Sequence, residues 1–261
     1  MSKRVAVVTG TSRGLGPAIA QGLAAEGFVV VCSSRDAKAG QSTADGLGLP
    51  FHRLDVTDPA DIAALVDRLR REHGGLDVLV NNAGVSLSGF NAQVARRTLD
   101  VNFVGTLQVT DALLPLLRPQ ARIVMISSGM GELSCLRPDL QAAFADPQLS
   151  RAALLALADR FVAAVSAGTH KQQGWPANAY SVSKVAMNAY VRLLARQLDS
   201  PSDDRGIQVN AVCPGWVRTA MGGRSAPLSP DEGARTPIWL ATRPESSPSG
   251  QFFRSQHPID W

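Results

Sequence analysis

The stretch that decides the fold lies near the N-terminus and reads Arg4-Val5-Ala6-Val7-Val8-Thr9-Gly10-Thr11-Ser12-Arg13-Gly14-Leu15-Gly16. Its first half is an apolar run typical of a strand buried on both faces, and an apolar helical segment follows the glycines. Glycines allow a tight turn and let backbone N–H groups approach an anion at a helix N-terminus. Their spacing here is G-x-x-x-G-x-G, which differs from the G-x-G-x-x-G pattern of many nucleotide-binding turns. The order strand, glycine turn, helix therefore predicts a pyrophosphate site.

The alternation of strands and helices continues along the chain. Apolar runs predict strands at Arg4–Thr9, Phe28–Ser34, Phe51–Asp55, Leu76–Asn81, Arg122–Ser127, Gln208–Val212 and Gln251–Phe253. Helices are expected after Asp58-Pro59, from Tyr180 to about Leu198, and after Ser229-Pro230. The expected fold class is α/β, a doubly wound parallel sheet of the Rossmann type in one domain spanning residues 1–261. Its ligand crevice is expected at the carboxyl ends of the strands.

Composition limits the classes of function. A chain of 261 residues with 45% hydrophobic content can bury a full core, and its charged fraction of 18% is not that of a disordered chain. The net charge of +4 is spread along the chain without interleaved aromatic residues, so no nucleic-acid partner is expected. No apolar run reaches the roughly 20 residues of a membrane span, and the first strand leaves no room for a signal peptide. Three scattered cysteines and four histidines without ligand spacing predict no metal and a cytoplasmic location.

A second informative pattern is Tyr180-Ser181-Val182-Ser183-Lys184. Residues four apart on a helix share a face, so the phenol and the ammonium can address one reacting atom. An adjacent cation favours the phenolate and is expected to lower the Tyr180 pKa towards neutrality. Taken alone, this spacing is more often a solvated helix face.

The choice of nucleotide depends on the tip of the second strand. An acidic side chain there would bind a ribose 2′-hydroxyl, whereas arginine would accept a 2′-phosphate. The strand ends at Ser34, Arg35 follows it, and Arg13 in the glycine turn offers a second guanidinium, which together favour NADPH. Asp36 argues for NAD unless it caps the following helix. Asp55, at the tip of the third strand, either meets the adenine edge or is an ordinary loop acid.

Several motifs in order give the chain a family resemblance. It is similar to the short-chain dehydrogenases/reductases through Thr9-Gly10-x-x-x-Gly14-x-Gly16, Asn81-Asn82-Ala83-Gly84, Asn102, Ser127-Ser128 and Tyr180-x-x-x-Lys184. Within that superfamily it resembles the monomeric NADPH-dependent carbonyl reductases. Related plant menthone- and alkaloid-type ketone reductases share the same layout. The motifs that carry this narrower resemblance are Lys171-Gln172-Gln173-Gly174-Trp175-Pro176, Cys213-Pro214-Gly215-Trp216-Val217-Arg218-Thr219, Gly233-Ala234-Arg235-Thr236-Pro237 and Gly250-Gln251-Phe252.

The resemblance implies a catalytic tetrad of Asn102, Ser128, Tyr180 and Lys184. Tyr180 would give its proton to the substrate oxygen while hydride arrives from the nicotinamide, and Ser128 would hold that oxygen. Lys184 would bind the nicotinamide ribose, and Asn102 would hold a helix distortion and a proton-supplying water. Ordinary alternatives are a buried cap for Asn102 and a strand-end turn for Ser128.

The resemblance also implies two sets of contacts. The residues expected to bind NADP(H) are Gly10, Ser12, Arg13, Gly14, Leu15, Gly16, Arg35, Asp55, Val56, Asn82, Ala83, Gly84, Tyr180, Lys184, Pro214, Gly215, Val217 and Thr219. The resemblance also implies that Asn81-Asn82-Ala83-Gly84 braces the central strand and approaches the adenosine ribose. The residues expected to line the substrate pocket are Ser128, Met130, Trp175, Trp216 and Met221, for which core packing is the ordinary alternative.

One departure from the usual superfamily plan carries information. An insertion of about residues 130–178 separates Ser128 from Tyr180, where most members have a dozen or so residues. Leu154, Leu157, Ala158, Phe161, Val162 and Val165 recur within it at helical period behind a Ser150 cap. Such a helix would cover the face through which other members pair into tetramers, so we expect a monomer.

The expected function is NADPH-dependent reduction of a ketone, aldehyde or quinone carbonyl to the alcohol, with a small-molecule substrate and Tyr180 as general acid. One alternative is NAD-dependent oxidation of a secondary alcohol, which Asp36 suggests. Another, from a different class, is a nucleotide-sensing regulator that has lost catalysis. The presence of all four tetrad residues argues against the regulator.

Overall fold

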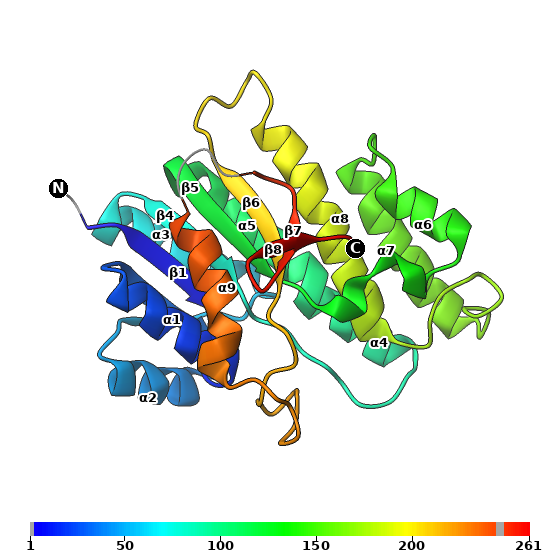
Figure 1. The fold of residues 1–261 in the computed structure, drawn as a ribbon, viewed down its shortest axis with the longest axis horizontal. Helices are drawn as coiled ribbons and strands as arrows, with labels where there is room; N and C mark the ends of the chain where they lie inside the picture. The colour runs from blue at the N-terminus through cyan, green and yellow to red at the C-terminus, as the bar shows by residue number, and fades with distance from the viewer. Residues whose placement is uncertain (1–2, 244–247) are drawn as a thin grey trace.

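A computed structural model describes residues 3–243 and 248–261 (Figure 1). This described part contains one eight-stranded sheet of order β3-β2-β1-β4-β5-β6-β7-β8. Neighbouring strands are parallel except for β8, which runs antiparallel to β7. The strands are β1 (Val5–Thr9), β2 (Val29–Ser34), β3 (Phe51–Arg53), β4 (Leu76–Asn81), β5 (Leu117–Ile126), β6 (Gln208–Cys213), β7 (Phe252–Arg254) and β8 (His257–Ile259). The predicted α/β fold class is confirmed.

Helices cover both faces of the sheet, because successive side chains of a buried strand point to opposite sides. In β1, Val5 and Val7 join one hydrophobic cluster, whereas Ala6 and Val8 join the other. The first cluster includes α3 (Pro59–His73), α4 (Ala92–Leu99), α5 (Gly105–Leu113) and α8 (Ala179–Leu198). The second includes α1 (Leu15–Ala25), α2 (Ala37–Leu47) and α9 (Pro230–Thr242).

Capping residues begin several helices where the sequence predicted them. The Asp58 carboxylate accepts a hydrogen bond from the Ala60 N–H at 2.9 Å, and Pro59 is the first residue of α3. A capping box begins α9, with Ser229 and Glu232 each bonding the backbone N–H of the other. In the described part of the chain, no helix is both long and apolar enough to cross a membrane.

The segment between Ser128 and Tyr180 contains two helices, not one. The predicted helix is α7 (Arg151–Ser166), and the Ser150 hydroxyl caps it by accepting the Ala153 N–H at 3.2 Å. A second helix, α6 (Pro138–Ala145), precedes it and was not predicted. Figure 1 shows both beyond α8, on the side of the molecule away from α1 and α2. Short 3-10 turns also occur at Leu114–Leu116, Gly129–Gly131 and Leu133–Cys135.

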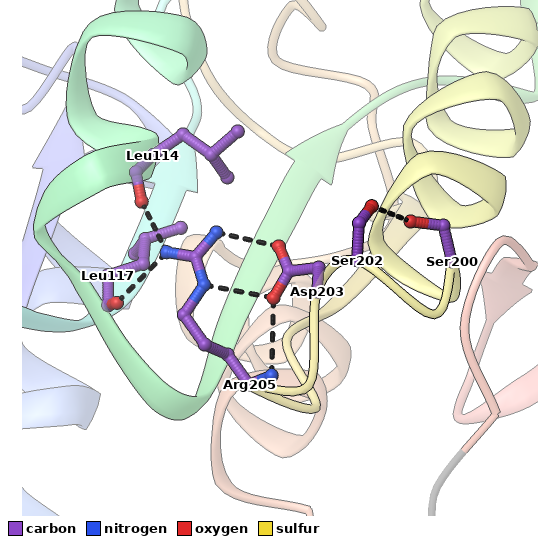
Figure 2. Close-up of polar contacts among 6 residues, drawn as sticks. All are labelled: Leu114, Leu117, Ser200, Ser202, Asp203 and Arg205. Carbon is purple, nitrogen blue, oxygen red and sulfur yellow. Dashed lines mark hydrogen bonds and ion pairs between the residues drawn. The ribbon is translucent and has the colours of Figure 1, made fainter.

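An arginine connects the neighbouring strands β5 and β6 at the end of the sheet where both begin (Figure 2). Arg205 donates from Nε and Nη2 to the Asp203 carboxylate at 2.9 and 2.7 Å, and from Nη1 to the carbonyl oxygen of Leu114 at 2.9 Å. Its own carbonyl accepts the Gln120 N–H at 2.7 Å. The loop after α8 is thereby fixed to the start of β5, and the carboxyl ends of the strands stay free for a site.

Candidate active site

Tyr180 and Lys184 lie together near the start of α8, as their spacing predicted. Asn178 begins this helix by accepting the Ser181 N–H at 3.0 Å. The Lys184 ammonium lies 5.4 Å from the centre of the Tyr180 ring. Both side chains therefore face the same region at the carboxyl end of β5.

Lys184 is a buried cation held by a backbone carbonyl. Its side chain is only 4% exposed, and Nζ donates a hydrogen bond to the carbonyl oxygen of Ile126 at 2.7 Å. Burial disfavours the charged form and lowers the Lys184 pKa from its ordinary 10.5 to about 7. The side chain is thus a cation that can lose its proton close to neutral pH.

The pKa of Tyr180 differs from the sequence prediction. We expected Lys184 to lower it, but burial raises the Tyr180 pKa above its ordinary value of 10, because desolvation penalises the phenolate. A hydrogen bond with Ser128 lowers the pKa by a smaller amount. Since Lys184 itself titrates near neutrality, it is not the permanent positive charge that the prediction assumed.

Ser128 lies just beyond the end of β5, and its hydroxyl acts on the Tyr180 phenol strongly enough to lower the pKa of that group. Its Oγ also accepts the Met130 N–H at 3.1 Å, and its carbonyl accepts the Gly131 N–H at 2.9 Å. The neighbouring Ser127 hydroxyl is buried and has no hydrogen-bond partner in the described part of the chain. The structure therefore brings the second serine, not the first, to Tyr180.

Asn102 sits in a helix distortion, as the resemblance implied. Residues Asp100–Val104 form a π-helix between α4 and α5. The Asn102 amide donates to the Val85 carbonyl at 2.9 Å and to Ser183 Oγ at 3.1 Å, and its oxygen accepts the Val85 N–H at 2.7 Å. Asn102 is thereby connected to α8 between Tyr180 and Lys184.

The glycine turn packs directly against the end of β4. Gly10 has φ +73°, and a Cβ added to it would lie 2.8 Å from the Ala83 Cα, so only glycine fits there. The Asn82 amide donates to the carbonyl oxygens of Thr9 and Gly10 at 2.8 and 3.0 Å. Asn82 thus joins the end of β4 to the glycine turn after β1.

The N-terminus of α1 is open to an anion. No side chain caps this helix, so its first N–H groups are available to a ligand. A Cβ on Gly14 would have Thr219 as its nearest neighbour, 3.5 Å from Cγ2. The predicted pyrophosphate turn and Thr219, another of the residues expected to bind the cofactor, thus border the same space. This geometry fits a dinucleotide.

Charged side chains lie at the tip of β2 and in the glycine turn, where the sequence placed the choice of nucleotide. The Asp36 carboxylate caps α2 by accepting the Ala39 N–H at 3.0 Å, which is the ordinary role left open for it. Arg13 and Arg35 are exposed, and neither forms an ion pair with an acid in the described part of the chain. Ser12 and Leu15, also predicted cofactor contacts, lie in the same turn and at the start of α1.

Asp55 and Val56 follow β3 at the predicted adenine side. Asp55 Oδ1 accepts the backbone N–H and the hydroxyl of Thr57, at 3.0 and 2.8 Å, so this carboxylate also supports its own turn. Its N–H donates to Asp61 at 2.7 Å. Val56 is 6% exposed, and a Cβ on Gly105 would lie 2.8 Å from its Cγ2.

The loop after β6 carries the remaining predicted cofactor residues. Pro214 and Gly215 come directly after this strand, and Gly215 has φ +84°. Val217 is buried and pairs with Leu228 in an isolated bridge. Thr219 Oγ1 accepts the Gly222 N–H at 3.1 Å. The loop is therefore ordered by its own hydrogen bonds.

Three of the predicted substrate-pocket residues are unusually exposed apolar side chains. Met130, Trp216 and Met221 are 49%, 56% and 52% exposed. Exposed apolar side chains mark a binding surface where they form a contiguous patch. The Trp216 indole donates to the Gly222 carbonyl at 2.8 Å, which fixes its ring on the loop.

The structure corrects the prediction for Trp175. This side chain is 2% exposed and belongs to the main hydrophobic cluster, with its ring 5.4 Å from Phe161 and 6.1 Å from Phe144. It joins α6 to α7 and does not face the substrate side with Met130. Its closeness to Tyr180 in sequence misled the prediction, because the chain between them turns before α8 begins.

A cleft of about 130 Å³ beside Tyr180 was missed by the sequence analysis. The Thr98 hydroxyl on its wall is buried and has no partner in the described residues. The sequence has a cluster of turn residues after β4, at the carboxyl end of the sheet where ligands bind in such folds, and this cluster could have indicated the cleft. The lining comprises Ser86, Leu87, Gly89 and Phe90 after β4, Val94 and Thr98 of α4, and residues 177–180.

Comparison with known proteins agrees with this geometry. The family model for short chain dehydrogenases matches residues 4–137, and the model named enoyl-(acyl carrier protein) reductase matches residues 147–238. The chain belongs to the short-chain dehydrogenase/reductase family. Its relatives include the "Carbonyl reductase [NADPH] 1" proteins of Sus scrofa and Homo sapiens, each 41% identical. These alignments cover 99% and 98% of this chain and 94% and 98% of the relatives.

Solved structures of other family members are also similar to the whole chain. Salutaridine reductase from Papaver somniferum has a TM-score of 0.90 at 30% identity, covering 96% of this chain and 99% of that one. Menthone neomenthol reductase from Mentha piperita has a TM-score of 0.84 at 30% identity, covering 97% and 99%. The chain is thus a short-chain dehydrogenase/reductase enzyme related to NADPH carbonyl reductases.

The buried Lys184 predicts how stability depends on pH when no cofactor is added. The Lys184 pKa is about 7 in the folded chain, and its ordinary value of 10.5 applies to the unfolded chain. Between these two pH values the unfolded chain therefore binds a proton that the folded chain lacks. Stability therefore rises from pH 7 towards pH 10. Above that range it falls, because Tyr180 and Tyr190 have raised pKa values and keep protons that the unfolded chain loses.

The measurement is the thermal midpoint of Lys184→Met and of the parent protein between pH 7 and 9.5. The thermal midpoint of Lys184→Met should rise less with pH than that of the parent. The midpoint of Lys171→Met, which changes an exposed lysine, should follow the parent. Parallel curves for Lys184→Met and the parent would contradict the low pKa of Lys184.

Proposed function

We propose that this enzyme catalyses the NADPH-dependent reduction of a ketone, aldehyde or quinone carbonyl to the alcohol. The observation that carries the proposal is the position of Lys184, whose ammonium lies 5.4 Å from the centre of the Tyr180 ring and bonds the Ile126 carbonyl at the end of β5, two residues before Ser128. A carbonyl oxygen that binds between the Tyr180 and Ser128 hydroxyls meets two donors at once. The names of the relatives support the same reaction class.

In this mechanism Ser128 and Tyr180 bind the substrate oxygen, and Tyr180 transfers its phenolic proton to that oxygen as negative charge develops. NADPH, when bound, supplies the hydride. Lys184 would hold the ribose hydroxyls of the bound cofactor and would return a proton to Tyr180 after the transfer. Asn102 holds the distorted turn beside α8, where a water can carry protons onwards from Lys184.

The protonation state of the phenol supports the proposed direction of reaction. Reduction needs a protonated tyrosine, whereas oxidation of an alcohol needs a phenolate to take its proton. The raised Tyr180 pKa keeps the proton in place at neutral pH. This favours carbonyl reduction over alcohol oxidation.

The choice of NADPH rests on Arg13 and Arg35. Arg35 follows the tip of β2 and Arg13 lies in the glycine turn, and both are exposed, so a 2′-phosphate can replace their water. A planar guanidinium suits a phosphate. Asp36, the basis of the NAD-dependent alternative, is engaged as the cap of α2. A regulator without catalysis would not need Tyr180 and Ser128 in contact.

Replacement of Tyr180 by Phe tests the proton donor. We expect kcat for carbonyl reduction to fall by at least about 100-fold, because general acid catalysis contributes about that much. The Kd for NADPH, measured by fluorescence titration, should stay within about 2-fold. A variant that reduced test quinones as fast as the parent would show that another group is the acid.

The double replacement Arg13→Ser, Arg35→Ser tests the cofactor preference. Loss of charge-assisted hydrogen bonds should raise the Kd for NADPH by about 10- to 100-fold and leave that for NADH nearly unchanged. Arg70→Ser on α3 is the matched control and should bind both cofactors as the parent does. If the parent already binds NADH as tightly as NADPH, the proposed preference is wrong.

A monomer is proposed because α6 and α7 cover α8. Two ion pairs hold the insertion over this face, Arg151 with Asp111 on α5 and Asp159 with Arg96 on α4, and the Leu149 carbonyl accepts from Arg196 on α8 at 3.0 Å. Light scattering after size-exclusion chromatography should give one species near 27.6 kDa. A tetramer in that experiment would overturn the proposal.

A further inference from the structure

Arg254 is a cation beside the candidate active site to which neither motif nor fold assigned a role. It ends β7 and pairs in register with Cys213 on β6. A Cβ added to Gly129 would lie 2.3 Å from Arg254 Nη2 and 3.7 Å from Cys213 Sγ. The guanidinium therefore occupies the space that a side chain at residue 129 would fill. That residue directly follows Ser128.

The guanidinium has hydrogen-bonding capacity to spare. Its acidic neighbour is Glu132, with 3.7 Å between Nη2 and Oε1, which is too long for a hydrogen bond. No hydrogen bond to the Arg254 side chain occurs within residues 3–243 and 248–261. The two side chains are 43% and 49% exposed, so water can be exchanged for a ligand at this position. Up to five N–H donors are available in a planar fork.

The surroundings define what such a ligand must carry. Next to Gly129, Met130 offers an exposed apolar surface, and Ser128 and Tyr180 offer donors to a carbonyl oxygen. The guanidinium lies beside Gly129, the residue that directly follows Ser128, so a small molecule held at the Ser128 hydroxyl would have the guanidinium within a few bonds of its length. A carboxylate is the anion that matches a guanidinium with two parallel hydrogen bonds.

We propose that Arg254 binds a carboxylate of the substrate, so that the preferred substrates are carbonyl compounds bearing a carboxylate a few bonds from the reacting carbon. This inference rests on the proposed carbonyl reduction and names the substrate class of that same site. The carboxylate stays unchanged in the reaction and only orients the molecule. Gly129 is needed because any larger residue would displace the guanidinium from the side of Ser128.

The test compares matched acids and esters. The probes are benzoylformate with its methyl ester and 3-carboxybenzaldehyde with its methyl ester, followed by NADPH oxidation. Arg254→Gln should lower kcat/KM at least about 10-fold for the acids and less than about 2-fold for the esters, because only the acids lose a charge-assisted pair. Glu132→Gln should raise kcat/KM for the acids by about 2-fold. Arg235→Gln, at an exposed position on α9, should change neither.

A binding measurement separates this inference from the proposed function. Benzoate, which cannot be reduced, should bind the parent protein in isothermal titration calorimetry at least about 10-fold more tightly than Arg254→Gln. Arg254-dependent benzoate binding without turnover of any probe would refute the reduction but keep the carboxylate site. Three results would each overturn the inference. Arg254→Gln could bind benzoate as tightly as the parent, it could lose kcat/KM equally for acids and esters, or it could bind NADPH more weakly.

Discussion

The hydrogen bond from the Lys184 ammonium to the Ile126 carbonyl connects the two elements on which the site depends. It joins α8, which carries Tyr180, to the end of β5, two residues before Ser128. Because Lys184 is buried and no carboxylate pairs with it in the described part of the chain, backbone dipoles must stabilise its charge. They do so incompletely, and the low pKa of Lys184 is the result. The position of Tyr180 and the protonation of Lys184 are therefore coupled.

Close backbone packing maintains this geometry. A Cβ on Gly131 would lie 2.8 Å from the Lys184 Cβ, so the turn after Ser128 lies flat against α8. The Asn188 amide, one helical turn beyond Lys184, donates to the Gly131 carbonyl at 3.2 Å. On the other side, Asn102 connects the π-helix to Ser183. Three separate segments thus fix the helix that carries the proposed acid.

The sequence predicted the elements whose signal is local. Strands such as β4 are apolar along their length, and α3 and α9 begin with clear capping residues, so their types and approximate bounds follow from the residues. The prediction failed where the signal was broken. β5 begins at Leu117, before the predicted Arg122, but Pro119 and the left-handed Gln120 (φ +66°) interrupt its apolar run. β8 is short and mostly exposed, so it has no alternating pattern.

The unpredicted parts of the site depend on burial and on contacts made across the sheet. Spacing alone brought Tyr180 next to Lys184, but only the fold shows that both are desolvated, which reverses the expected shift of the Tyr180 pKa. Arg254 reaches Gly129 from a strand more than a hundred residues later, and the glycine that accepts it gives no signal by itself. Motifs report the groups that carry the chemistry. The side chains that select a substrate come from distant strands and loops, because specificity depends on the walls that the fold assembles around those groups.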